Sequence, residues 1–387
     1  MLLDNQIDIS KELMDFIKES PTAFHVVKNF STMLEKAGFI KLNERNKWKI
    51  EQGGKYYVTR NDSSIIAFQV PDNMDFYNFQ IAAAHSDSPA FKIKENPEMV
   101  EDNNYVTLNV EKYGGMLMAP WFDRPLSVAG RVIVREDSGL KPVLVNVDRD
   151  LCVIPNLAIH MNRDVNNGIK YNPQKDMIPL FGEIASKDKF EKIIAMEAGT
   201  DADSIVSADL FLYNREVGKI WGADNEFMSA PRLDDVMCAF SCIKALTDNK
   251  ENSKSVNVCA IFDNEEVGST TKQGADSSFL YDALSRISMC MGKDSEDFIR
   301  ACASSFMLSA DNAHAVHPNY KEKADPTNRP YMNKGIVIKY NANQKYTTDA
   351  ISASIFKEIC KKAGVEVQSY VNRSDIPGGS TLGNISN

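Results

Sequence analysis

The stretch LDDVMCAFSCIKALTDN, residues 233–249, is followed after a short polar segment by SVNVCAIFD, residues 255–263. Three- and four-residue spacing of apolar side chains in the first stretch predicts a helix that packs on a core. These side chains are Val236, Phe240, Ile243 and Leu246. The second stretch is a short, continuous apolar run, which is typical of a strand buried on both faces. Together the two stretches predict a helix followed by a central strand.

The same alternation continues toward the end of the sequence. SSFMLSAD, GIVIKYN and VEVQSYV have strand character, whereas SSFLYDALSRISM and residues 348–363 have helical character. Upstream, residues 8–37 predict two helices broken at Pro21, and YYVTR, SIIAFQV and FQIAAA predict strands. Strands that alternate with helices predict an α/β fold with a mixed, mostly parallel sheet covered by helices.

The middle of the sequence has a different pattern. Residues 103–222 contain short β-type runs, such as VAGRVIVRE and KPVLVNVD, separated by Gly, Pro and Asn, and long helical patterns are weak there. The simplest organisation is a discontinuous α/β domain of residues 1–95 and 226–387, interrupted by an inserted β-rich domain of residues 96–225.

Composition excludes several classes of function. The 387 residues carry a formal net charge of −9, which argues against a nucleic-acid partner because phosphate binding needs a surplus of Lys and Arg. No stretch approaches the roughly 20 apolar residues of a membrane helix, and the N-terminus has no apolar region typical of a signal peptide. The seven cysteines are scattered, without a C-x-x-C pair, which favours reduced thiols and a cytoplasmic location.

Acidic and histidine side chains follow three of the predicted central strands. They come directly after FQIAAA, VNVCAIFDN and FMLSA, and a further acid lies at the start of the helix near Leu233. Open α/β sheets bind ligands at the carboxyl ends of their strands, and carboxylate and imidazole groups are suitable metal ligands. The candidate residues are His85, Asp87, Glu265, Glu266, Asp311 and Asp234.

Each of these residues has an ordinary structural alternative. His85 could be a core histidine, and Asp87 could form a turn before Pro89. Glu265 and Glu266 could be a solvated pair on a loop, Asp234 could cap its helix, and Asp311 could form a turn beside Asn312. Spacing alone favours the metal site only because all these groups would meet at one edge of the sheet.

Several longer motifs stand out from about residue 20 onward. They are SPTAFHVV, AAAHSDSPAFKIK, WFDRPLSVAGRV, IPNLAIHMNR, APRLDD, DNEEVGS, SADNAHAVHPNY and NRSDIPGGSTLG. In this order they resemble the aspartyl aminopeptidase family of dinuclear zinc metallopeptidases. The resemblance implies a zinc-peptidase α/β domain with an inserted β-rich domain used for dimerisation.

The resemblance also implies a role for each candidate in a site with two zinc ions, for which Mn²⁺ or Co²⁺ are alternatives. Asp234 would bridge the two ions, His85 and Asp311 would complete the first, and Glu266 would bind the second. Glu265 would be the general base that takes a proton from the attacking water, and Asp87 would be a catalytic residue that orients His85.

Two further residues and the partners follow from the same resemblance. Lys339 matches the basic residue that faces an acidic substrate side chain, and His160 matches the histidine that reaches the active site of a neighbouring subunit. The implied substrates are peptides with a free N-terminus and, most favourably, an acidic first residue. The implied assembly is a homo-oligomer of dimer units, up to a tetrahedral dodecamer.

The sequence departs from the family pattern at one point. Family members take a histidine ligand for the second zinc from a segment beyond the GGSTLG motif, and this sequence ends at Asn387. We therefore expect the zinc bound by Glu266 to lack one protein ligand, either because this is a fragment of a longer protein or because it is a natural truncation. The alternatives for function are an aminopeptidase of broader specificity and a truncated, non-catalytic assembly protein.

Overall fold

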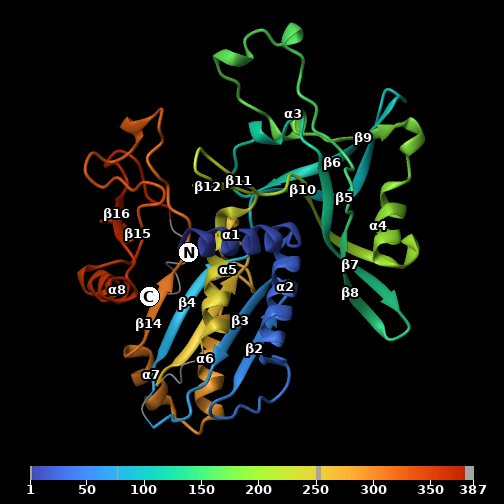
Figure 1. Ribbon diagram of the computed structural model, residues 1–387. Helices are drawn as coiled ribbons and strands as arrows, with labels where there is room; N and C mark the ends of the chain where they lie inside the picture. Colours follow the sequence, from blue (N-terminus) through green and yellow to red (C-terminus); the bar gives the residue numbers. More distant parts are fainter. Residues whose placement is uncertain (1, 76, 250–253, 380–387) are drawn as a thin grey trace.

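A computed structural model describes residues 2–75, 77–249 and 254–379. Two six-stranded sheets dominate it, and they lie at opposite ends of the molecule in Figure 1. The first sheet has the strand order β1-β2-β3-β13-β4-β14. Its strands are β1 (Ile40–Leu42), β2 (Lys55–Arg60), β3 (Ser64–Gln69), β4 (Phe79–His85), β13 (Val256–Phe262) and β14 (Phe306–Ser309).

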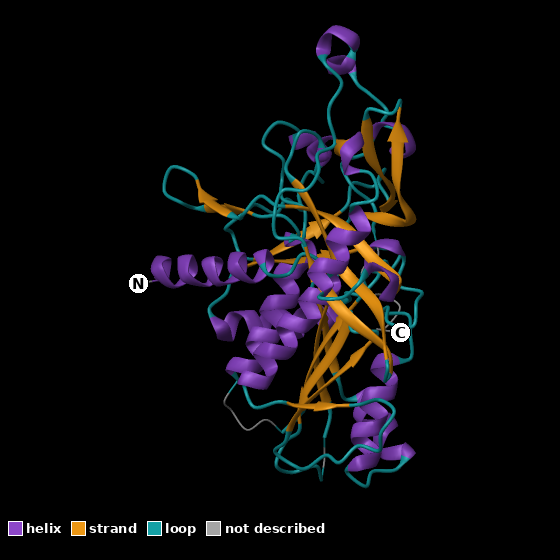
Figure 2. Ribbon diagram, turned by 90° about the vertical axis from the view of Figure 1, so that its right-hand side faces the viewer, coloured by secondary structure: helices purple, strands orange, loops and turns teal. Residues whose placement is uncertain are grey.

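This first sheet is mixed and is covered by helices on both faces, as the sequence predicted. β1 is parallel to β2, and β13 and β14 are both parallel to β4, whereas β3 is antiparallel to its two neighbours. The covering helices are α1 (Leu2–Lys18), α2 (Ala23–Lys36) and α5 (Leu233–Asp248) on one face, and α6 (Phe279–Cys290) and α7 (Ser295–Ala303) on the other (Figures 1 and 2).

The two-residue period of the strands explains why both faces are covered. Ile65 and Ala67 of β3 pack in the core with α1, α2 and α5, whereas the alternate residues Ile66 and Phe68 pack in the core with α6 and α7. A strand that is apolar at every position can be stable only if both of its faces are buried. The central strands are therefore held rigidly, and so are the residues at their ends.

The second sheet is antiparallel throughout and has the order β8-β7-β10-β5-β6-β9. Its strands are β5 (Ala90–Glu101), β6 (Tyr105–Tyr113), β7 (Leu126–Glu136), β8 (Gly139–Asn146), β9 (Leu180–Glu183) and β10 (Ile205–Asn214). It has its own core, to which Phe190 and Ile194 of α4 (Phe190–Ala198) contribute. The domain boundaries at residues 95 and 225 stay a prediction, and β5 begins before the first of them.

The remaining elements lie outside the two large sheets. They are the short helix α3 (Pro173–Asp176), the hairpin of β11 (Lys219–Trp221) and β12 (Phe227–Ser229), and the parallel pair β15 (Ile336–Tyr340) and β16 (Val367–Val371) with α8 (Ala350–Ala363) between its strands. In the described part of the chain, β15 and β16 form a separate two-stranded sheet. Among the helices described, none has the length and apolar character needed to cross a membrane.

Candidate metal centre

The carboxyl ends of three neighbouring strands bring the candidate residues together. β13, β4 and β14 run parallel, so the residues after them meet at one edge of the first sheet. His85 is the last residue of β4 and pairs with Phe262 at the end of β13, and Asp311 follows two residues after β14. Asp234 and Asp235 come from the first turn of α5, which packs on the same sheet.

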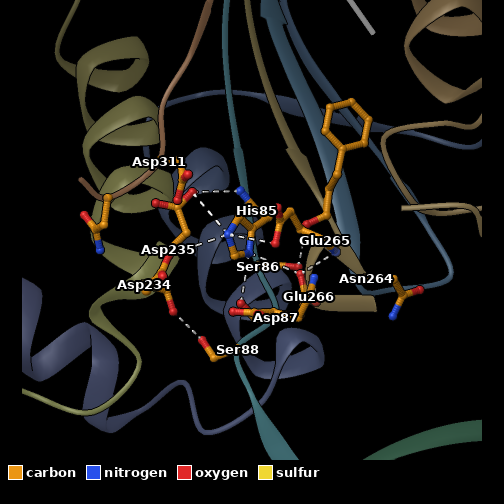
Figure 3. A network of polar contacts seen from close by, with 12 residues as sticks. His85, Ser86, Asp87, Ser88, Asp234, Asp235, Asn264, Glu265, Glu266 and Asp311 are labelled. Carbon is orange, nitrogen blue, oxygen red and sulfur yellow. Dashed lines mark hydrogen bonds and ion pairs between the residues drawn. The ribbon is translucent and has the colours of Figure 1, made fainter. Parts of the chain in front are cut away.

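His85 lies in the middle of this group, as Figure 3 shows. Its Nδ1 is 3.1 Å from the carbonyl oxygen of Asp87 and 3.3 Å from the Asp87 carboxylate. Both partners are acceptors, so Nδ1 carries the proton. The other nitrogen, Nε2, is 3.7 Å from Asp234 Oδ1, 3.9 Å from Asp235 Oδ2 and 3.9 Å from Glu265 Oε2.

These distances fit a metal ion better than direct hydrogen bonds. They are too long for hydrogen bonds, whereas two atoms that each lie about 2.1 Å from one zinc ion are at most about 4.2 Å apart. Ligand atoms of His85, Asp234, Asp235 and Asp311 all lie within 4.8 Å of one another, a slightly wider spread than the ligands of one zinc ion have. One imidazole nitrogen and several carboxylate oxygens form a donor set that zinc accepts.

Asp235 belongs to this group although the sequence reasoning did not select it. Its side chain is fully buried, and its Oδ2 accepts a hydrogen bond of 3.1 Å from the backbone N–H of His85. Its Oδ1 has no hydrogen-bond partner in the residues that the structure describes. A buried carboxylate oxygen without a partner is costly, and a bound cation would satisfy it. The Asp-Asp pair in APRLDD was the only signal for it in the sequence.

The electrostatics of the group also indicate a cation. Burial is the main reason that the pKa values of Asp235 and Glu265 are raised to about 7 and that of Glu266 to about 8. Burial alone would lower the pKa of His85, but contact with Asp87 and the nearby carboxylates raises it to about 10. The neighbouring carboxylates raise the pKa of His85 although its burial acts in the opposite direction, which indicates an excess of negative charge around it that a metal ion would neutralise.

The glutamate pair lies on a tight turn beside the group. Glu265 and Glu266 begin a 3-10 helix (Glu265–Val267) directly after Asn264, whose φ is +63°. Their backbone N–H groups donate to the Asp87 carboxylate at 3.2 Å each. Asp87 therefore contacts both His85 and the turn that carries the two glutamates.

Comparison with known proteins identifies the family. A family model described as aminopeptidase I zinc metalloprotease (M18) matches residues 16–387. The chain belongs to the M18 family. It is therefore a metalloaminopeptidase, an enzyme that hydrolyses peptides, and this agrees with the resemblance stated from the sequence motifs.

Relatives of known sequence or known structure align with nearly the whole of this chain. A probable M18 family aminopeptidase 2 from Clostridium acetobutylicum is 52% identical over 392 residues, which is 99% of this chain and 90% of the relative. The cryo-EM structure of the Ape4 and Nbr1 complex has a chain that is 38% identical with a TM-score of 0.93, covering 97% of this chain and 77% of that one. The S. cerevisiae mApe1 dodecamer has a TM-score of 0.83 at 28% identity, with 98% of this chain and 86% of that chain covered.

A large cavity opens beside the metal centre of the M18 chain. It has a volume of about 1010 Å³ and lies between the first sheet's edge and the antiparallel sheet. Asp87, Asp234 and Glu266 line it on the side of the metal centre, and Trp121 and Phe211 line it on the side of the antiparallel sheet. The site therefore has room for a peptide next to the candidate ligands.

Lys339 contacts the metal centre through Asp311. Its ammonium group on β15 is 2.8 Å from Asp311 Oδ2 and 2.8 Å from the carbonyl oxygen of Asn312. Both side chains of the ion pair are largely buried, with 17% and 18% exposed. The structure thus brings Lys339 to the site and pairs it with a candidate ligand.

His160 is the one predicted site residue that lies away from the metal centre of its own chain. It is exposed and belongs to a 3-10 helix (Ile159–Met161) in the loop before α3. That green loop extends away from the first sheet at the top of Figure 1. Exposed apolar side chains flank His160, including Leu157, Ile159 and Met161.

Proposed function

We propose that this M18 enzyme removes N-terminal residues, preferably Asp or Glu, from peptides with the help of two zinc ions. The observation that supports it best is the convergence of three carboxylates on Nε2 of His85, at 3.7 to 3.9 Å, at the end of a parallel sheet. In this proposal His85 and Asp311 would hold one ion, Glu266 would hold the other, and Asp234 would bind both. Mn²⁺ or Co²⁺ would suit the same oxygen and nitrogen donors.

Metal ions in such a site supply Lewis-acid polarisation of the scissile carbonyl and lower the pKa of water. Glu265 is the general base in the proposal, because its carboxylate is directed at the group and its pKa is close to neutrality. It accepts a proton from the attacking water and returns it to the leaving amine. Asp87 holds the His85 ring through its contacts with Nδ1.

Lys339 is the proposed reason for a preference for acidic first residues. Its ammonium group is within 2.8 Å of a candidate ligand, so a substrate carboxylate at the metal centre would lie within its reach. The same contact favours a second candidate, an aminopeptidase of broader specificity, because Asp311 already neutralises this cation. Kinetics must therefore separate the two.

We further propose that the enzyme is a cytoplasmic homo-oligomer of dimer units, up to a tetrahedral dodecamer, without nucleic-acid or membrane partners. The dodecameric state of the S. cerevisiae relative supports this, and so do the exposed apolar side chains around His160. In the assembly, His160 would contact the active site of a neighbouring subunit. The non-catalytic alternative has no support of this kind.

The test combines zinc content with kinetics on Asp-, Glu-, Leu- and Lys-anilides. We expect about two ions per chain in the loaded enzyme, loss of activity in EDTA, and faster cleavage of the acidic anilides. Lys339→Ala should reduce the Asp-to-Leu preference by roughly 10- to 100-fold, the value of one charge-assisted hydrogen bond. Lys334→Ala, at an exposed lysine just before β15, is the matched control. An unchanged preference in Lys339→Ala would leave the broader-specificity enzyme.

A further inference from the structure

Tyr113 connects the antiparallel sheet to the metal centre. It is the last residue of β6, and its hydroxyl donates a hydrogen bond of 2.6 Å to Asp87 Oδ2. The same hydroxyl accepts a hydrogen bond of 2.9 Å from the Asn264 side chain. Asn264 directly precedes the turn that carries Glu265 and Glu266. The tyrosine therefore contacts both the carboxylate that orients His85 and the residue that leads into the glutamate turn.

These and further contacts fix the orientation of the Asp87 carboxylate. One carboxylate oxygen faces His85 Nδ1 at 3.3 Å and accepts from the Glu265 N–H, and the other accepts from the Glu266 N–H and from Tyr113. Burial opposes ionisation of Asp87, but His85, Tyr113 and the Glu266 backbone together hold its pKa below the usual range. Burial and the Asp87 charge raise the pKa of Tyr113, so its hydroxyl keeps the proton that it donates.

The backbone after Tyr113 also approaches the glutamate turn closely. Gly114 has a φ of +77°, and a Cβ built there would lie 2.9 Å from the Cβ of Glu266. Glycine is needed here both for the backbone conformation and for the space. Asn264, in turn, is fixed because its Oδ1 accepts hydrogen bonds from Thr271 and Gln273. The end of β6 is therefore fitted against a rigid turn.

We propose that Tyr113 is a positioning residue through which the antiparallel sheet sets the orientation of Asp87, and thereby of His85 and the Glu265–Glu266 turn, for metal binding. This inference rests on the proposed function, because it assumes that these residues hold a metal. Carboxylates that orient a ligand histidine typically contribute 10- to 100-fold to metal affinity or activity. Tyr113 acts one contact further out, through the carboxylate.

The test is the zinc dissociation constant of metal-free Tyr113→Phe, measured by competition with a chelator. We expect zinc to bind roughly 10-fold more weakly, within the range found for groups that support a metal ligand. Tyr105→Phe is the matched control, because Tyr105 begins the same strand and is 53% exposed. The turnover number of the zinc-saturated Tyr113→Phe enzyme should also fall, while the Michaelis constant changes less.

A double mutant separates positioning from a general packing role. If Tyr113 acts through Asp87, Tyr113→Phe should weaken zinc binding in the wild-type background but add almost nothing to Asp87→Asn. Equal losses in both backgrounds, or wild-type zinc affinity in Tyr113→Phe, would overturn the proposal.

One further variant covers the case in which Tyr113→Phe does not fold. Asn264→Gly removes the second hydrogen bond to the hydroxyl while tolerating the positive φ, and unchanged zinc affinity in that variant would then overturn the proposal. The zinc measurements need no peptidase activity, so failure of the proposed reaction would be seen separately, as wild-type enzyme that binds zinc without turnover.

Discussion

The two sides of His85 are organised in different ways. On one side, ligand atoms of Asp234, Asp235 and Asp311 lie with His85 Nε2 inside one group, all within 4.8 Å of one another. On the other side, Glu266 lies outside that group and lines the cavity. The first side comes from strand ends and a helix that are packed in the core. The second depends on a short turn that Asp87 and Tyr113 hold in place.

This difference predicts unequal metal affinities. A site whose donors are already close together loses little conformational entropy on binding, whereas a site that adds only one carboxylate on a turn to the shared Asp234 is weaker. In the described residues, histidine contributes to the first side only. We therefore expect the ion on the side of Asp311 to bind first and the ion on the side of Glu266 to bind second.

The largest effect should come from removing the residue that the two sides share. Asp234→Ala should lose both ions and reduce turnover on the order of 10⁴-fold or more, because residues that act as one unit each cost nearly as much as the whole site. Metal analysis of the purified variant checks this. Asp311→Ala and Glu266→Ala are the comparisons, and each should lose only the ion on its own side. Two ions retained in Asp234→Ala would show that it does not bridge.

The next largest effect should come from removing the proposed general base, a change that separates proton transfer from metal binding. Glu265→Gln keeps the size of the side chain and removes only the base, so zinc content should stay at the wild-type level while turnover falls by about 10²- to 10⁴-fold. Zinc content and single-turnover kinetics measure the two parts. Glu111→Gln, an exposed change on β6, serves as the control. A Glu265→Gln enzyme with near wild-type turnover would exclude Glu265 as the base.

Much of the first side could be predicted from the sequence. Apolar runs such as FQIAAA and VNVCAIF locate buried strands, and parallel strands must bring their carboxyl ends to one edge. His85 and Asp311 follow from that rule alone. The two helices around Pro21 and the mixed sheet were predicted for the same reason, because apolar periodicity reports burial directly.

The contacts that could not be predicted join residues that lie far apart in the sequence. Tyr113 reaches Asp87 from a different sheet, and its strand has no pattern that marks its last residue. Lys339 pairs with Asp311 through a contact between two separate sheets. β15 and β16 have the same apolar pattern as the central strands, so periodicity alone could not show that they pair with each other. Such contacts depend on packing between elements, which local patterns do not encode.

The smallest expected effect is on stability and depends on pH. Without metal, the pKa values of Glu265 and Glu266 are raised to about 7 and about 8, mainly by burial. A carboxyl group with a raised pKa contributes stability that is fully present below its unfolded value, near 4, and is lost as pH rises through the folded value. His85, with a pKa of about 10, changes in the same direction above pH 6.5. The metal-free chain should therefore become less stable between pH 6.5 and 8.

Thermal unfolding in EDTA at pH 6.5 and 8 measures this change, which we expect to be a few degrees in the midpoint. The window avoids His25, whose pKa is lowered to about 4, mainly by burial, and which acts in the opposite direction at lower pH. Glu265→Gln combined with Glu266→Gln should reduce the difference, because neither amide can ionise. Zinc should stabilise the wild-type chain more at pH 8 than at pH 6.5, since deprotonated ligands bind it more tightly. A metal-free midpoint that rises with pH in this window would mean that folding does not raise the pKa values of Glu265, Glu266 and His85.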